Sequence, residues 1–183
     1  MKQKIICFFV LMTTINLVAE SQVYYTKNGN ISFFSKSVIQ DIEAENNQVI
    51  SVLNTQTGEL QFSLLSNAFH FPKAKMEEDF NENYIESNKY PRSTFKGKIT
   101  NLNEVEFSKD GSYKANVTGN LTIHGVTKNI TTPATISVTN GNVSGTATFH
   151  ILVKDYKIEI PSIVSNKVAE NIEIKVNCNY QKK

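Results

Sequence analysis

The sequence predicts an all-β protein that folds as an antiparallel barrel or sandwich. Apolar and polar residues alternate along most of the chain, which is the period of a strand with one buried face. Turn residues such as Lys109-Asp110-Gly111 and Thr139-Asn140-Gly141 separate the alternating segments at short intervals. A helical period occurs in a single segment. Short strands at this spacing, with so little helix, are typical of a sandwich or barrel.

Residues 1–21 are expected to form an export signal, and residues 22–183 the folded domain. Lys2 and Lys4 precede an apolar run over residues 5–12, and small residues around Ala19 suit a signal peptidase. A membrane anchor is the alternative, but this run falls short of the roughly 20 apolar residues that span a bilayer. The segment therefore predicts export.

The first predicted hairpin joins residues 48–53 to residues 60–64. Leu60, Phe62 and Leu64 alternate with polar residues, and Thr57-Gly58 supplies the turn. These apolar side chains are expected to face the interior.

Residues 75–86 form the predicted helix. Met76, Phe80 and Tyr84 are spaced four apart and share one face, whereas acidic residues occupy the other faces and the first turn. A single amphipathic helix in an all-β chain most simply plugs or flanks an open barrel end.

Residues 121–128 read as a strand that is interrupted at His124-Gly125 and resumes at Val126. Gly125 lacks a Cβ, so it can form a bulge or bend that carries the strand around a curved wall. His124 is the histidine best placed for a functional role, because such a bend would lie near the mouth of a barrel. The alternative role is to satisfy backbone groups that the bulge leaves unpaired.

Alternation continues to the C-terminal region. Phe149 and Ile151 lie in a predicted strand that follows the turn at Asn140-Gly141-Asn142, where positive φ is favoured. The last strand alternates over residues 172–180. Cys178 lies on its apolar side and is expected to be a small core residue, because removal of the export signal would discard Cys7.

Four segments in matching order carry a resemblance to a known family. They are Tyr90-Pro91, Phe95-Lys96-Gly97, residues 121–128 and residues 155–161, which begin Asp155-Tyr156. Over residues 69–180 the chain resembles the YceI-like family. The resemblance implies a secreted, lipocalin-like antiparallel β-barrel of about eight strands with one short amphipathic helix. It also implies a periplasmic or secreted protein of the bacterial envelope that holds a polyisoprenoid, isoprenoid quinone or fatty-acid-like lipid.

Two classes of function remain open. On the residues alone, the apolar strand faces are better explained by a solid core, as in an envelope interaction or structural module without a small-molecule ligand. The family resemblance favours a hollow barrel with an apolar ligand. The residues then expected to line the cavity are Phe62, Phe71, Phe80, Phe95, Ile123, Phe149 and Ile151. His124 and Tyr156 are the polar residues that could contact a head group.

Composition and motifs exclude several other functions. The 19 basic and 17 acidic residues give a net charge of +2 without basic runs, which does not suit nucleic acid. No nucleophile elbow or phosphate-binding glycine loop is present, so catalysis is not expected. No metal site or required cofactor is expected either, although a bound polyprenyl or quinone-type lipid, or a histidine acting with quinone or haem, is a further hypothesis. A monomer or homodimer with transient membrane contact is compatible with the sequence.

Overall fold

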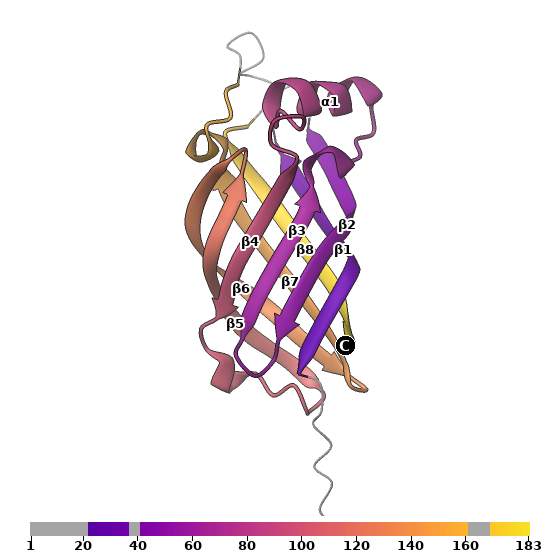
Figure 1. The fold of residues 1–183 in the computed structure, drawn as a ribbon, viewed down its shortest axis with the longest axis vertical. Coiled ribbons are helices and arrows are strands. Elements are labelled where there is room, and N and C mark those ends of the chain that lie inside the picture. Colours follow the sequence, from indigo (N-terminus) through magenta and orange to yellow (C-terminus); the bar gives the residue numbers. More distant parts are fainter. Residues whose placement is uncertain (1–21, 37–40, 161–168) are drawn as a thin grey trace, which may run out of the picture.

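The computed structural model describes residues 22–36, 41–160 and 169–183. Eight antiparallel strands each pair with the next along the chain, and the last pairs with the first to close a barrel (Figure 1). The predicted all-β barrel is thus confirmed, whereas the proposed export signal lies outside the described residues. The strands are β1 Val23–Ser35, β2 Ile42–Asn54, β3 Glu59–Leu65, β4 Arg92–Ile99, β5 Gly111–Ile123, β6 Val126–Thr139, β7 Asn142–Leu152 and β8 Asn171–Lys182.

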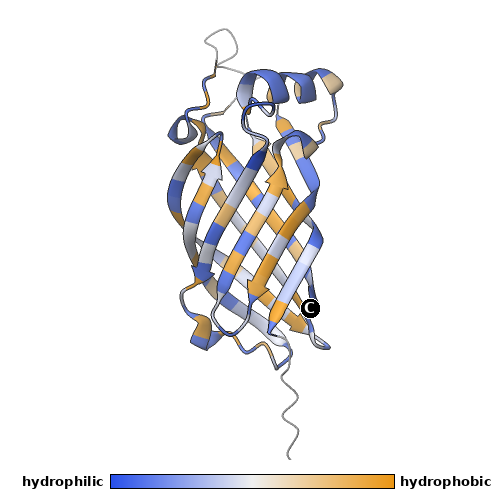
Figure 2. Cartoon of the chain, in the orientation of Figure 1, coloured by the Kyte–Doolittle hydropathy of each residue, from blue (hydrophilic) through white to orange (hydrophobic). Residues whose placement is uncertain are grey.

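Alternating side chains give each strand an inner and an outer face. In β8, Ile172, Cys178 and Tyr180 are buried, whereas Lys175 and Asn177 between them are exposed. The same alternation colours the strands in successive orange and blue bands (Figure 2). The predicted hairpin of β2 and β3 is also present, with Leu53 opposite Leu60. Cys178 is a buried free cysteine, as expected for a core residue.

The His124-Gly125 prediction needs a correction. These residues do not bend one continuous strand, because they form a two-residue turn that joins β5 to β6, with Ile123 opposite Val126. Both residues have positive φ, 50° and 72°. Two successive positive φ values reverse the chain as in a hairpin of type I′, whereas a bulge only bends a strand that then continues onward. The turn at Asn140-Gly141 has the same signs, as predicted.

A helical cap covers one end of the barrel between β3 and β4 (Figure 1). It consists of α1, Ala74–Asp79, followed directly by one π-helical turn, η2, Phe80–Tyr84. The predicted helix is confirmed to within two residues at either end. No helix among the described residues is long and apolar enough to cross a bilayer.

The end of the barrel away from the cap is filled with side chains. Its buried residues form one cluster, which we call the distal core: Tyr24, Leu53, Leu60, Phe95, Ile99, Val105, Ala115, Val117, Ile136, Val138, Val143, Cys178 and Tyr180. Two smaller clusters lie nearer the cap, one around Phe69 and one around Tyr156. The space between them and the distal core is where the candidate site lies.

Pairing between β6 and β7 covers only the distal half of these strands, because it begins at Ala134 opposite Ala147. Nearer the cap, β7 still pairs with β8 up to Leu152 opposite Asn171. The chain then forms a 3-10 turn, η4, Val153–Tyr156, which contacts β6. This turn places Tyr156 beside the β5–β6 hairpin.

Candidate functional site

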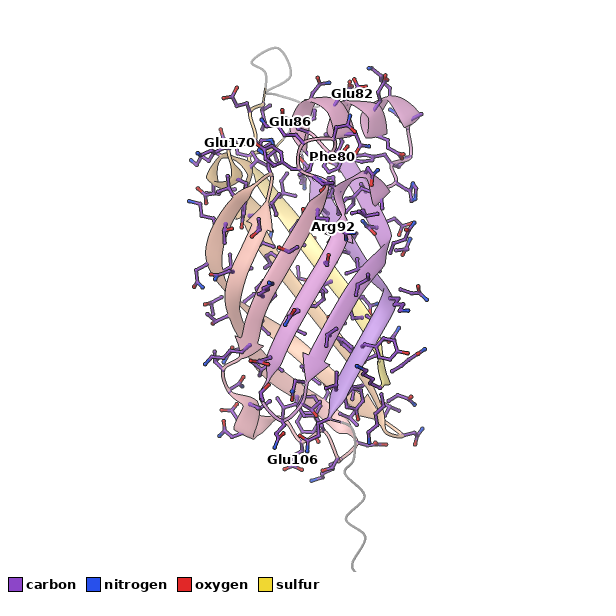
Figure 3. All side chains as sticks on the ribbon, viewed as in Figure 1. Phe80, Glu82, Glu86, Arg92, Glu106 and Glu170 are labelled. Carbon is purple, nitrogen blue, oxygen red and sulfur yellow. The ribbon has the colours of Figure 1, made fainter. Side chains whose placement is uncertain are left out.

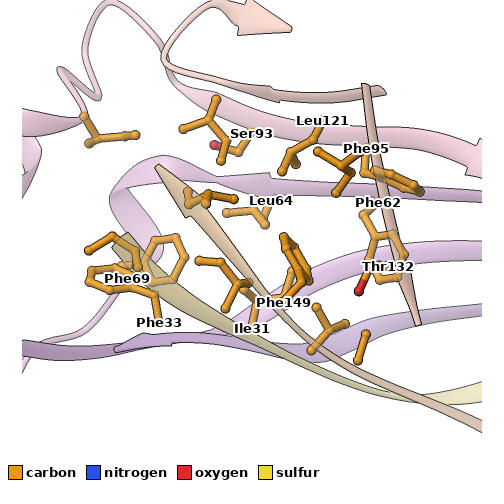
Figure 4. Close-up of a pocket in the computed structure, with 18 of the residues that line it drawn as sticks. Ile31, Phe33, Phe62, Leu64, Phe69, Ser93, Phe95, Leu121, Thr132 and Phe149 are labelled. Carbon is orange, nitrogen blue, oxygen red and sulfur yellow. The ribbon is translucent and has the colours of Figure 1, made fainter. Parts of the chain in front are cut away.

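An apolar cavity of about 420 Å³ lies inside the barrel beneath the cap (Figure 4). Strands β1 and β3 to β8 supply most of its wall, and Met76, Phe80 and Tyr84 of the cap also face it. The helix face predicted from these three residues therefore points into the barrel. The only charged side chain among the described lining residues is Asp79, at the cap.

The structure brings seven of the nine predicted site residues to this cavity. They are Phe62, Phe71, Phe80, Phe95, Ile123, Phe149 and Ile151. His124 and Tyr156 do not line it. The role of each residue toward a ligand stays a prediction, but the barrel is hollow in this region and packed with side chains in its distal core.

Four aromatic rings gather at the capped end of the cavity. The ring of Phe80 lies 5.5 Å from Phe33, 5.7 Å from Phe69 and 5.1 Å from Phe71, measured between centroids. Figure 3 shows Phe80 between the cap and the barrel. These tilted and edge-on contacts are favourable for aromatic pairs, so they hold the cap against β1 and the segment after β3.

Two further rings mark the opposite end of the cavity. Phe62 and Phe95 are paired across β3 and β4, with centroids 6.2 Å apart and an angle of 65° between the ring planes. Figure 4 shows them at the far end from Phe33 and Phe69. Phe95, together with Leu60, Val117, Ile136 and Tyr180, both lines the cavity and belongs to the distal core. These five residues therefore form the floor of the cavity.

The cavity extends along the barrel axis. Ile172 and Tyr180 both line it and lie eight residues apart on β8. At about 3.4 Å per residue they are roughly 27 Å apart along the strand. A strand tilt of about 40° reduces this to about 20 Å along the barrel axis. A volume of about 420 Å³ over that length fits one slender chain.

His124 fastens the cap and η4 to the β5–β6 hairpin. Its Nε2 lies 2.7 Å from a carboxylate oxygen of Glu86, which follows the cap, and its Nδ1 lies 3.0 Å from the carbonyl oxygen of Tyr156. Carboxylate and carbonyl groups only accept, so both bonds form together when His124 is protonated on both nitrogens. The Tyr90 ring packs edge-on against His124, with centroids 4.4 Å apart.

Gly125 allows this close packing. A Cβ at Gly125 would lie 2.5 Å from an edge carbon of the Tyr90 ring, and its φ of 72° disfavours any other residue. Each residue of the His-Gly pair thus has a structural role. His124 joins the hairpin turn to the segment that follows the cap, and Gly125 allows the two to pack closely.

Tyr156 is a core residue and not a rim residue. Its side chain is 2% exposed and packs in the cluster with Ile151, Val153 and Ile172. Burial, followed by the charge of Asp155, raises the pKa of the Tyr156 phenol to about 12. The buried position of Tyr156 outside the cavity wall therefore gives no support to its predicted contact with a head group.

We expect His124→Ala to destabilise the protein by about 1–3 kcal/mol, because the Tyr156 carbonyl loses its partner and the cap loses its tether. Thermal unfolding would measure the change. The matched control is His150→Ala. His150 is 54% exposed and lies 3.8 Å from Glu173, so its loss should cost less than about 0.5 kcal/mol. Equal effects of the two variants would contradict the tethering role.

Acid should weaken the same tether. The hydrogen bond from His124, with a smaller contribution from the charge of Lys89, lowers the pKa of Glu86 below its ordinary 4.5. A carboxylate with a lowered pKa stabilises the fold above its ordinary value, and this contribution disappears as the pH falls through the lowered pKa. Glu86→Gln should therefore reduce the unfolding midpoint at neutral pH and lose this effect in strong acid. A pH-independent difference would contradict the prediction.

The other two histidines lie apart from His124. His70 lies 3.7 Å from Glu77, and His150 pairs with Glu173. Among the described residues, no group of three or more histidine, cysteine or acidic side chains could hold a metal ion. The cavity wall is the feature that the geometry offers for binding.

Sequence reasoning missed several wall residues. Ile31, Phe33, Leu121 and Ile174 line the cavity but were not predicted as site residues. Ile31 and Phe33 alternate in β1, so the strand period could have found them. Glu86 had no such signal, because its contact with His124 joins residues 38 apart.

Comparison with known proteins agrees with this geometry. The model of the YceI-like domain family matches residues 15–180, which extends the predicted similarity toward the N-terminus. No curated protein matches the chain.

Several solved structures share the fold. A polyisoprenoid binding domain from Saccharophagus degradans is 13% identical, with a TM-score of 0.77 over 90% of this chain and 100% of that one. Burkholderia cenocepacia BcnA is 16% identical, with a TM-score of 0.65 over 84% and 96%. The Campylobacter jejuni YCEI protein is 19% identical, with a TM-score of 0.57 over 79% and 88%.

Proposed function

Because the chain belongs to the YceI-like family, we propose that it is a secreted binding protein of the bacterial envelope that carries or sequesters a long apolar ligand inside its barrel. The ligand classes are a polyisoprenoid, an isoprenoid quinone or a fatty-acid-like lipid. The observation that carries the proposal is the apolar cavity of about 420 Å³ beneath the cap. The structural similarity to a polyisoprenoid binding domain supports the first class.

Burial alone supplies enough free energy for such binding. Each buried methylene contributes about 0.8 kcal/mol, so eight give roughly 6 kcal/mol before the cost of ordering the chain. No bond is made or broken. Residues 1–21 support the export part of the proposal, because their basic start and apolar run are typical of a signal peptide.

The wall also favours an uncharged ligand. Asp79 is the only charged residue among the described residues that line the cavity, and it is acidic. It lies 3.0 Å from Lys75, which partly balances its charge. A carboxylate drawn into this cavity would lose hydration without meeting a cation among the described lining residues. Polyisoprenoids and quinones therefore fit better than an ionised fatty acid.

Organic extraction of the purified protein followed by mass spectrometry tests the proposal directly. An uncharged isoprenoid should be recovered. Displacement of a fluorescent apolar probe by an alcohol and by the carboxylate of equal length tests the head-group preference, and the alcohol should bind more tightly. A protein that yields no lipid and shows no saturable apolar site would refute the proposal in favour of an interaction module.

A further inference from the structure

We propose that the cavity encloses a chain of about 17 carbons and that Phe95, in the floor, sets this limit. The inference rests on the proposed function and specifies its ligand. It assigns a lipid of about three to four isoprene units, or a straight chain of similar size, as the ligand that is fully enclosed.

The limit follows from the volume. An apolar protein cavity of about 150 Å³ takes up one benzene molecule, which has six carbons. At that density a cavity of about 420 Å³ holds about 17 carbons. A longer chain would fill the cavity and leave its remaining carbons in water, where they add nothing to the affinity.

The floor is rigid because the distal core beneath it is packed. Tyr180 is 6% exposed, and its hydroxyl lies 2.9 Å from that of Ser51 inside the barrel. Leu53, Val138 and Val143 of the distal core are at most 2% exposed and do not line the cavity. A chain that reaches the floor therefore finds no further space in the direction of the uncapped end.

Phe95 is held in place by two facing glycines. Gly97 in β4 pairs with Gly119 in β5. A Cβ on either glycine would lie 2.6 Å from the tip of the Phe95 ring. Because neither glycine has a side chain, the ring packs directly against the backbone of these two residues. The face of the ring that is turned away from the glycines borders the cavity opposite Phe62. Removal of the ring would therefore deepen the cavity by the volume of the ring.

A series of uncharged alcohols of increasing chain length, each competing with a fluorescent apolar probe, tests the limit. In the wild-type protein each added methylene should tighten binding about fourfold, and the gain should stop near 17 carbons. Phe95→Ala removes six ring carbons, so its plateau should begin about six carbons later. Ala147→Phe adds a ring to the cavity wall, so its plateau should begin about six carbons earlier than that of the wild-type protein.

Phe107→Ala is the matched control. Phe107 packs against the distal core but does not line the cavity, so its variant loses the same ring without a change in cavity depth. Its plateau should match that of the wild-type protein. Thermal unfolding of every variant shows whether the variant has kept its fold. The plateau of Ala147→Phe should shift to shorter chains, and this test does not depend on whether Phe95→Ala is stable.

The outcomes separate the two proposals. Affinity that rises through chains well beyond 20 carbons would overturn the length limit while leaving the proposed function intact. Equal plateaus in Phe95→Ala, Ala147→Phe and Phe107→Ala would overturn the role of the floor. A protein that binds no alcohol of any length would overturn the proposed function itself.

Discussion

Phe149→Asp should abolish the binding of uncharged lipids, with an affinity at least about 100-fold lower than that of the wild-type protein. Phe149 lines the cavity from β7, opposite Ile174 of β8. A lipid in the variant would strip water from an unpaired carboxylate, which costs about 3 kcal/mol or more. The empty variant should still fold, because water can enter the cavity and hydrate the carboxylate.

The control for this experiment is Thr148→Asp. Thr148 is exposed on the outer face of the same strand, so the same charge is added one residue away but outside the cavity. Probe displacement should give wild-type affinity for Thr148→Asp and no saturable binding for Phe149→Asp. Similar affinities for the two variants would show that lipid does not occupy the barrel.

Gly119→Ala should destabilise the barrel by about 3 kcal/mol. Its Cβ would lie 2.5 Å from the Cα of Gly97 and 2.5 Å from the carbonyl oxygen of Lys96, as well as close to the Phe95 ring. Two of these three atoms belong to the backbone, so β4 and β5 would have to separate, and overpacking of this kind is costly. Urea or thermal unfolding would measure the loss.

Gly145→Ala provides the comparison, because Gly145 also lies in a strand and lines the cavity. The nearest atom to a Cβ there is the Cδ1 of Ile136 at 3.4 Å, which is an ordinary contact. The substitution should change stability by less than about 1 kcal/mol. A comparable loss in both variants would contradict the close approach of β4 and β5.

The strand pattern predicted the fold well because a closed antiparallel barrel needs one buried face on every strand. The alternation of β8 and the helix face of Met76, Phe80 and Tyr84 are local periodicities, and both were confirmed. Such patterns do not distinguish a filled barrel from a hollow one. Phe95 has the same alternation whether its ring meets a ligand or another side chain, so only the three-dimensional structure shows which residues line a cavity.

Contacts between segments that are far apart in the sequence could not be predicted from local sequence patterns. His124-Gly125 was predicted to bend a strand, because a glycine between apolar residues suits a bulge as well as a hairpin turn. The choice depends on Val126 pairing back onto Ile123. Likewise, the meaning of Gly119 depends on its register with Gly97, which no local pattern reveals.

The pairing of β1 with β8 affects how the protein folds. Phe33 of β1 lies opposite Ile174 of β8, so the wall is completed only by segments from opposite ends of the chain. Such remote partners give a high contact order, which slows folding. A nascent polypeptide that lacks β8 would present two unpaired strand edges, and these are templates for aggregation. We therefore expect truncation of the chain before β8 to produce insoluble protein, although β1 to β7 and most residues that line the cavity are retained.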